Sequence, residues 1–274
     1  MDLLPVAGDG AVSRRRGFLE RDAARLYWEA TGDGPALVFA HGLGGSHLSW
    51  WQQVAAFADR FTCVAFAHRG FLPSRDAVVP RGPAAFTEDL LALLDHLALP
   101  DAVLVAQSMG GWTCLEAALR APRRVRALVM SATSGTIDPG RVTELGDWRA
   151  RAEAEVARGM LRGVHPAMGA RAASEQPALH LLYRHFDDSA GIADKEAMRA
   201  ALGALRVRGP EAVDALAMPV LWLAGAEDVV FPPAAAVALA ERMGTQAEII
   251  PETGHSPYFE RAAAFNTALA RFVG

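Results

Sequence analysis

The sequence predicts an α/β protein whose mostly parallel sheet is covered by helices on both faces. Short, unbroken apolar runs alternate with longer amphipathic stretches along most of the chain, and its length of 274 residues suits one large α/β domain. Unbroken apolar runs are typical of strands buried on both faces, as in parallel sheets. Their alternation with helices implies right-handed crossover connections.

The predicted strands are the apolar runs, and the predicted helices are the amphipathic stretches between them. The strands are Ala36–Ala40, Phe61–Ala67, Ala102–Gln107, Val125–Ser131, Val220–Ala224 and the shorter Ala247–Ile250. The helices are Leu48–Arg60, Ala85–Leu97, Met109–Ala121, Ala234–Met243 and Phe259–Phe272. Thr87-Glu88-Asp89 before a Leu-rich periodic stretch is typical of a helix start.

One long interval, from Asp138 to Gly209, contains helical pattern but no strand-like run. It is too long for an ordinary connection. Because the strand–helix alternation resumes at Met218, we expect a helical cap, residues 138–209, inserted into a core formed by residues 1–137 and 210–274.

The formal charge is −4 and no long run of like charges occurs, so we expect neither a nucleic acid nor a membrane surface as partner. We interpret Arg14-Arg15-Arg16 as a solvated turn. Residues 1–7 lack the basic leader of a signal peptide, and every apolar run is shorter than the roughly 18 residues that span a membrane. Two cysteines, Cys63 and Cys114, form no disulfide framework, which favours a cytoplasmic location.

A candidate nucleophile, Ser108, directly follows the predicted strand Ala102–Gln107 and precedes Met109-Gly110-Gly111 and a helix. A strand–serine–helix turn is the context of a nucleophile elbow, which exposes the hydroxyl at the carboxyl end of a sheet. The usual pattern is G-x-S-x-G, whereas here Ala106 occupies the first position. A serine that only caps a helix is the alternative.

A serine becomes nucleophilic when a base, held by an acid, takes its proton. Among the eight histidines, His255 is favoured as base because its Gly-His-Ser-Pro loop follows the last predicted strand. Asp228, after the Val220–Ala224 strand, is the candidate acid. The order Ser–Asp–His along the chain is the one that accompanies a nucleophile elbow. Neighbouring Glu227 and the earlier Asp138 remain alternatives.

Backbone N–H groups of Leu43 and Met109 are the expected oxyanion hole. Leu43 lies in the glycine-rich stretch His41–Gly45, which follows the strand Ala36–Ala40. Each such donor contributes about 3 kcal/mol to transition-state stabilisation. Dinucleotide binding is disfavoured because His47 replaces the third glycine of G-x-G-x-x-G and the next strand ends at Ala67-His68, without an acidic residue.

These motifs together resemble the α/β-hydrolase superfamily, in its esterase, lactonase and C–C hydrolase branch. The motifs are His41-Gly42, His68-Arg69-Gly70, Gln107-Ser108-Met109-Gly110-Gly111, Gly225-Ala226-Glu227-Asp228 and Gly254-His255-Ser256-Pro257. The resemblance implies an eight-stranded, mostly parallel sheet with a cap after the sixth strand, and no cofactor. Ser108 argues against dehalogenases and epoxide hydrolases, which have Asp there. The family usually has Asp where Ala67-His68 stands.

The expected substrate pocket is mostly apolar. Its expected residues are His41, Gly42, Trp112, Phe231, Trp148 and Tyr183. An arginine of the cap, Arg149 or Arg184, is a candidate for binding a substrate carboxylate, although a solvated helix face is favoured. His180, His185, Asp187 and Asp188 lack a known metal-ligand spacing, so no metal site is expected.

The sequence thus favours a cofactor-independent serine hydrolase that cleaves an ester or lactone of a small, largely apolar substrate. A hydrolase of carbon–carbon bonds in diketone-like compounds would use the same triad. A ligand sensor that keeps the fold with little turnover is a third hypothesis, because fold alone does not fix function. A homodimer is compatible with the sequence.

Overall fold

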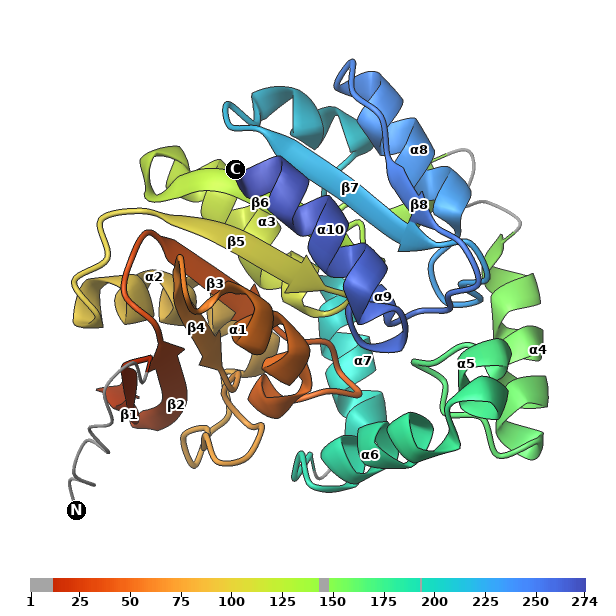
Figure 1. The fold of residues 1–274 in the computed structure, drawn as a ribbon, viewed down its shortest axis with the longest axis horizontal. Helices are drawn as coiled ribbons and strands as arrows, with labels where there is room; N and C mark the ends of the chain where they lie inside the picture. The colour runs from red at the N-terminus through yellow and green to blue at the C-terminus, as the bar shows by residue number, and fades with distance from the viewer. Residues whose placement is uncertain (1–11, 143–147, 193) are drawn as a thin grey trace.

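The computed structural model describes residues 12–142, 148–192 and 194–274, so residues 1–7, which were not expected to form a signal peptide, lie outside it. In this part of the chain, eight strands form one sheet in the order β1-β2-β4-β3-β5-β6-β7-β8 (Figure 1). Its strands are β1 (Arg14–Arg21), β2 (Ala24–Thr31), β3 (Ala36–Ala40), β4 (Thr62–Phe66), β5 (Ala102–Gln107), β6 (Val125–Ser131), β7 (Val220–Gly225) and β8 (Glu248–Ile250). From β4 to β8 every neighbouring pair is parallel, which confirms the predicted fold class.

Helices cover both faces of the sheet, as the alternating pattern predicts. In the described residues they are α1 (Trp51–Phe57), α2 (Phe86–His96), α3 (Gly110–Arg120), α4 (Trp148–Leu161), α5 (Ala170–Glu175), α6 (Pro177–Asp188), α7 (Lys195–Ala204), α8 (Pro233–Arg242), α9 (Pro257–Glu260) and α10 (Ala262–Val273). The predicted helix Phe259–Phe272 is interrupted at Arg261, whose φ of −131° and ψ of 57° are not helical. This break separates α9 from α10.

The first two strands, β1 and β2, form an antiparallel hairpin that the sequence analysis did not predict. Arg14-Arg15-Arg16 begins β1, so its interpretation as a turn was wrong, although all three residues are exposed. The hairpin turns at Asp22-Ala23, where both residues have positive φ, as the two-residue turns favoured in hairpins require. Neither residue is the glycine or asparagine that usually signals such a turn.

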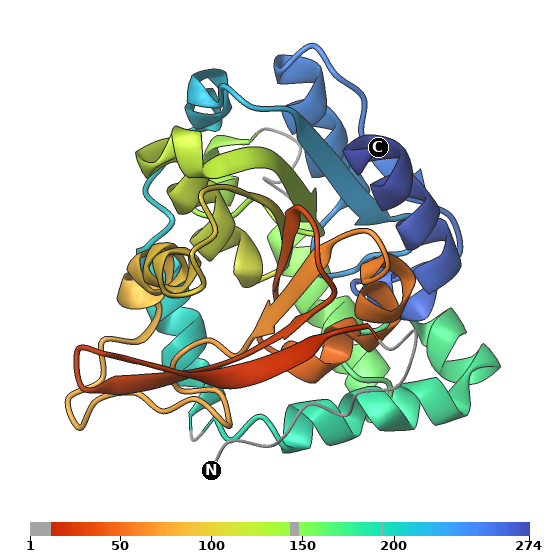
Figure 2. The ribbon, with the colours of Figure 1, turned by 60° about the vertical axis from the view of Figure 1, so that its left-hand side comes forward.

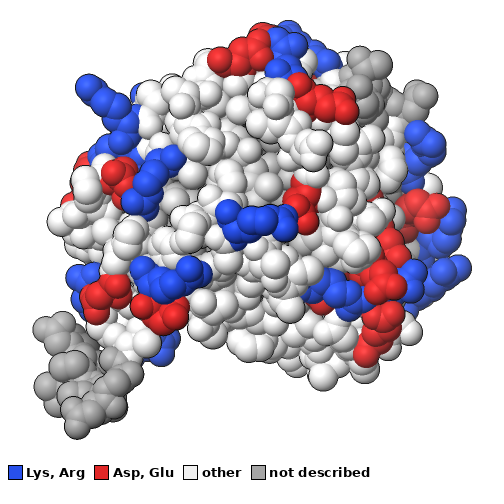
Figure 3. Space-filling view, turned by 45° about the horizontal axis from the view of Figure 1, so that its top comes forward, with Lys and Arg blue, Asp and Glu red and all other residues white. Residues whose placement is uncertain are grey.

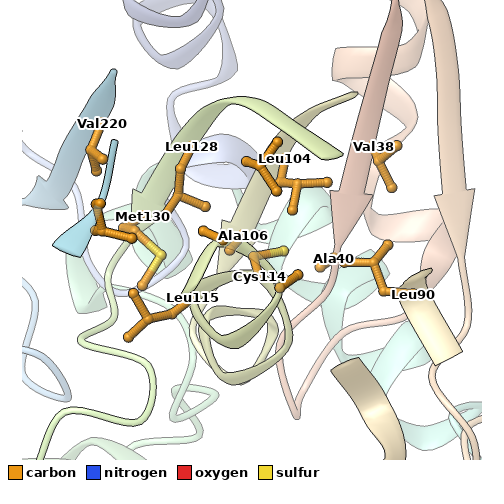
Figure 4. Close-up of a cluster of buried hydrophobic side chains, with 14 of the residues drawn as sticks. Val38, Ala40, Leu90, Leu104, Ala106, Cys114, Leu115, Leu128, Met130 and Val220 are labelled. Carbon is orange, nitrogen blue, oxygen red and sulfur yellow. The ribbon is translucent and has the colours of Figure 1, made fainter. Parts of the chain in front are cut away.

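Alternate residues of the central strands pack into two cores, one on each face of the sheet. Val38, Leu104 and Leu128 pack toward α2, α3 and α8 (Figure 4). Their neighbours Leu37 and Val103 pack on the opposite face, toward α1 and α10. Because both faces are covered, the strands are apolar throughout, which is why they were recognisable in the sequence.

Residues 138–209 join β6 to the chain that leads into β7 and contain α4 to α7. Both ends of this segment, here called the insertion, lie side by side, because Ile137 and Arg208 form an isolated parallel bridge. The guanidinium of Arg208 also pairs with the buried carboxylate of Glu116 on α3. Figures 1 and 2 place the insertion beyond the carboxyl ends of β5 and β7, so it covers the edge where Ser108 was expected.

Charged side chains of both signs are interspersed on the surface. On the face drawn in Figure 3, Lys and Arg occur beside Asp and Glu in small groups. Within the described ranges, no helix combines the length and the apolar character that crossing a membrane requires.

Candidate active site

Ser108 lies in a sharp turn between β5 and α3 and has a left-handed φ of 49°. Its N–H donates to the carbonyl of Ser131 at 3.0 Å, and its own carbonyl accepts from Gly111 N–H at 2.9 Å. A left-handed φ in a non-glycine residue costs of order 1–3 kcal/mol and needs surrounding structure to hold it. This is the geometry expected of a nucleophile elbow.

The glycine that the elbow requires is Gly110, not residue 106. A Cβ on Gly110 would lie 2.2 Å from the carbonyl oxygen of Ala40 in β3, so the helix can approach the strand only with glycine there. Ala106, where the usual pattern has glycine, belongs to regular strand and pairs with Ala40 and Met130. Its methyl group fits in the core beside Cys114 (Figure 4).

The side chains of Ser108, His255 and Asp228 form a continuous chain of hydrogen-bonding contacts. Nε2 of His255 lies 3.0 Å from Oγ of Ser108, and Nδ1 of His255 lies 2.9 Å from Oδ2 of Asp228. Asp228 is 2% exposed and His255 5% exposed, so the chain is shielded from bulk water. The structure therefore brings together the three residues selected from the sequence.

The other oxygen of Asp228 is also fixed. Its Oδ1 accepts hydrogen bonds from the N–H groups of Val230 and Phe231, at 2.7 and 2.9 Å. The alternative acid Glu227 instead pairs with Arg171. The alternative Asp138 accepts from Gly140 N–H at the start of the insertion.

The side chain of His41 fixes the glycine-rich loop after β3 through hydrogen bonds. Nε2 of His41 accepts from the N–H of His68, so the proton lies on Nδ1, which donates to the carbonyl of Gly42 at 2.9 Å. Burial lowers the pKa of His41 to about 3, so its ring is neutral. The Gly42 carbonyl also accepts from Gly45 N–H at 3.1 Å.

These bonds determine where the N–H of Leu43 points. In a trans peptide the N–H is antiparallel to the carbonyl, so it points away from His41 and Gly45. Within the described residues, the N–H groups of Leu43 and Met109 have no acceptor. Both are thus free to donate to a bound oxygen.

A cavity of about 780 Å³ opens above Ser108 and lies between the sheet edge and the insertion. Near Ser108 it is lined by Leu43, Gly44, Val230 and His255. Its far wall, contributed by the insertion, combines apolar residues such as Val156, Met160 and Val164 with a group of charged and polar ones. That wall includes Glu153, His165, Arg184, Asp187, Asp188, Lys195, Glu196 and Arg199.

Of the six residues expected to form the pocket, only Tyr183 is among those that line this cavity. The side chain of Gln107 occupies the space beside Gly42, with Oε1 2.1 Å from where a Cβ would lie. Trp112 instead packs on the insertion, where its Nε1 donates to the carbonyl of Leu202. His41 and Phe231 are buried in or beside the core, and Trp148 begins α4 outside the lining.

A polar cluster in the far wall was missed as a feature of the pocket. Asp187 accepts hydrogen bonds from Nε2 of His165 at 3.0 Å and from Nζ of Lys195 at 2.6 Å. His180, considered above with Asp187 for a metal site, accepts through Nε2 from the N–H of His165. The sequence offered no signal for this cluster, because its members come from separate parts of the insertion.

Comparisons with known proteins agree with this architecture. A family model described as the alpha/beta hydrolase fold matches residues 35–262. The chain is 30% identical over 246 residues to 3-oxoadipate enol-lactonase 2 of Acinetobacter baylyi, covering 86% of this chain and 88% of that protein. It is also similar to two solved structures, each 25% identical with a TM-score of 0.76. These are Est816, described as an N-acyl homoserine lactone degrading enzyme (93% of this chain, 100% of that chain), and a thermophilic esterase from Thermogutta terrifontis (94% and 98%).

Proposed function

Because the chain belongs to the α/β-hydrolase fold family, we propose that it is a cofactor-independent serine hydrolase that cleaves a carboxylic ester or lactone. The observation that carries the proposal is the hydrogen-bonded chain Ser108–His255–Asp228, which ends in a strained serine at the floor of a cavity. Relatives named as lactonase and esterase support the same class of bond.

In the proposed reaction, Oγ of Ser108 attacks the acyl carbon while Nε2 of His255 takes the hydroxyl proton. The carbonyl oxygen becomes an oxyanion and accepts hydrogen bonds from the N–H groups of Leu43 and Met109. The oxyanion then reforms the carbonyl, the ester C–O bond breaks, and the leaving oxygen takes the proton from His255. A water molecule, deprotonated by His255, attacks the acyl-enzyme, and the acid is released as Ser108 regains its proton.

Asp228 has two tasks in this scheme. Through Oδ2 it holds the proton of His255 on Nδ1, so that Nε2 faces Ser108 as an acceptor. It also stabilises the imidazolium that forms in each step. The two N–H groups from Val230 and Phe231 keep the carboxylate in place.

The cavity supports a substrate with two different ends. Leu43 and Val230 beside Ser108 suit an apolar group next to the reacting carbonyl, whereas the insertion offers Asp187, Lys195 and Arg199 farther away. We therefore propose an apolar character only for the part of the substrate near Ser108, and not for the whole substrate. A polar distal group is proposed in addition.

Intact-mass labelling with a fluorophosphonate tests the proposal, on wild type and Ser108→Ala. One adduct on the wild type and none on the variant would support an activated Ser108. A panel of esters and lactones, with products identified by mass, then separates C–O cleavage from C–C cleavage. No adduct on well-folded wild type would contradict the proposal and favour a ligand sensor.

A further inference from the structure

The buried carboxylate of Glu260 lies beside the loop that carries His255. Glu260 is the last residue of α9 and is 2% exposed. Its Oε2 accepts a hydrogen bond from the N–H of Gly254 at 2.8 Å, and its Oε1 accepts one from the N–H of Ser256 at 3.0 Å. One carboxylate therefore binds the two peptide N–H groups that flank His255 in the sequence.

The same carboxylate reaches the insertion. Oε1 of Glu260 also accepts from the N–H of Gly169 at 3.2 Å. Gly169 and Gly254 lie against each other, because a Cβ on Gly254 would be only 2.3 Å from the nitrogen of Gly169. Oγ of Ser256 donates to the carbonyl of Ala167 at 2.6 Å. The segment 167–169 of the insertion thus rests directly on the loop of His255.

The electrostatics of Glu260 are unusual for a residue outside a reaction centre. Burial raises the pKa of its carboxyl, and the nearby charge of Asp228 raises it further, whereas the three backbone hydrogen bonds lower it. In the described part of the chain, no Lys or Arg forms an ion pair with Glu260. A buried carboxylate is costly unless hydrogen bonds compensate it, and here backbone N–H groups provide that compensation.

A purely local role explains only part of this arrangement. A glutamate that reaches back to the N-cap residue of its own helix forms an ordinary helix cap, and the bond to the N–H of Ser256, the N-cap of α9, fits that description. The N–H groups of Gly254 and Gly169 lie outside α9, so a helix cap does not account for them. What the three donors share is their position around His255.

We propose that Glu260 is a positioning residue, which fixes the backbone on both sides of His255 and ties it to segment 167–169 of the insertion. This inference rests on the proposed function, because it concerns the distance between Nε2 of His255 and Oγ of Ser108. A displacement of about 1 Å in a catalytic group can lower a rate about 100-fold. Glu260 touches neither reacting atom and acts only through the loop.

The test is the variant Glu260→Gln, compared with wild type for esterase kinetics and for the rate of fluorophosphonate labelling. Its side chain has the same shape, but its amide NH₂ cannot accept from one of the N–H groups. We expect kcat to fall about 10- to 100-fold, with KM changed less than threefold, and the labelling rate to fall in parallel. Circular dichroism verifies that the assayed protein is folded.

The matched control is Glu252→Gln, which changes an exposed carboxylate only three residues before His255. It should leave kcat and the labelling rate at wild-type values. A folded Glu260→Gln variant with wild-type kcat and labelling would overturn the inference. Absence of labelling in the wild type would instead contradict the proposed function, so the two failures are distinguishable.

Glu260→Gln could fail to fold, and a measurement on the wild type covers that case. Gly254 and Ser256 belong to no helix or strand, yet their N–H groups should resist hydrogen exchange because Glu260 binds them. Residue-resolved exchange by NMR checks this directly. Exchange of both groups at the rate of an exposed loop would overturn the inference.

Discussion

Oδ2 of Asp228 lies 2.9 Å from Nδ1 of His255, although another aspartate, Asp138, also stands between Ser108 and His255 in the sequence. Chain order alone therefore allowed both aspartates, and Glu227 as well. The geometry distinguishes between the two aspartates, because the carboxylate of Asp138 accepts a hydrogen bond from the N–H of Gly140 at the start of the insertion. Only Asp228 is placed to orient the imidazole.

We predict that Asp228→Asn lowers kcat about 10⁴-fold, because an amide NH₂ can favour the wrong tautomer of His255. Asp138→Asn is the matched control and should change kcat less than threefold. Both are measured with an ester that the wild type hydrolyses. A silent Asp228→Asn together with an inactive Asp138→Asn would contradict the assignment of the acid.

A second prediction concerns His41, which orients the peptide between Gly42 and Leu43 through a hydrogen bond. His41→Phe keeps a ring but removes both nitrogens, so the N–H of Leu43 loses its fixed direction. Loss of a whole oxyanion donor lowers kcat about 10²- to 10³-fold, so misorientation should cost about 10- to 100-fold. The change should appear in kcat more than in KM.

The control for His41 is His96→Phe, at an exposed position at the end of α2. It should leave kcat unchanged. Because burial lowers the pKa of His41 to about 3, its ring does not titrate between pH 5 and 8. A kcat of wild-type size in folded His41→Phe would show that Gly45 N–H alone holds the Gly42 carbonyl.

A third prediction compares the two positions of the elbow that differ in their need for glycine. Gly110→Ala places a methyl carbon 2.2 Å from the backbone oxygen of Ala40, which cannot move without disturbing β3. We expect a loss of about 3 kcal/mol or more in the free energy of unfolding, measured by urea denaturation. Ala106→Gly should lose only about 1 kcal/mol and keep its activity.

Either result of the opposite kind would change the account of this turn. Wild-type stability of Gly110→Ala would mean that α3 can move away from β3. A large gain in activity of Ala106→Gly would mean that Ala106 does strain the turn, as the departure from the usual motif first indicates.

The central sheet could be predicted from the sequence because its strands are buried on both faces and therefore apolar throughout. β1 and β2 could not, since β1 has no buried residue, β2 mixes buried and exposed residues, and their turn at Asp22-Ala23 lacks a glycine. Predicted helix ends also failed where backbone conformation decides them, as at Arg261. Such breaks depend on packing and not on local composition.

The candidate site also has a part that could be predicted from the sequence, the catalytic residues, and a part that could not, the lining of the cavity. Ser108, Asp228 and His255 follow strands of a parallel sheet, whose carboxyl ends meet at one edge, so their proximity followed from the fold. The lining of the cavity did not, because it depends on how the insertion packs. Trp112 shows this well: it lies one turn after Ser108, yet it packs on Leu202 and not into the cavity. Glu260 was not identified from the sequence, because its hydrogen-bond partners are backbone N–H groups that lie beside it only in the folded structure.

The last prediction concerns the stability of the fold at acidic pH and the pair formed by Glu116 and Arg208 where the insertion joins the core. The pKa of Glu116 is lowered from 4.5 to about 2, because hydrogen bonds from Arg208 and Thr136 outweigh the burial that would raise it. A carboxyl with a lowered pKa stabilises the fold above its unfolded pKa, and this contribution disappears as the pH falls from about 4.5 to about 2. The shift corresponds to about 3 kcal/mol.

Glu116→Gln cannot ionise, so it should lose this contribution at pH 7 and show it as a lower free energy of unfolding in urea. The difference between wild type and variant should shrink as the pH is lowered from about 4.5 toward 2. Glu248→Gln, which changes a partly exposed carboxylate paired with Arg271, should show a difference below about 1 kcal/mol at every pH. A difference for Glu116→Gln that stays constant down to pH 2 would mean that its carboxylate does not hold the two ends of the insertion through its charge.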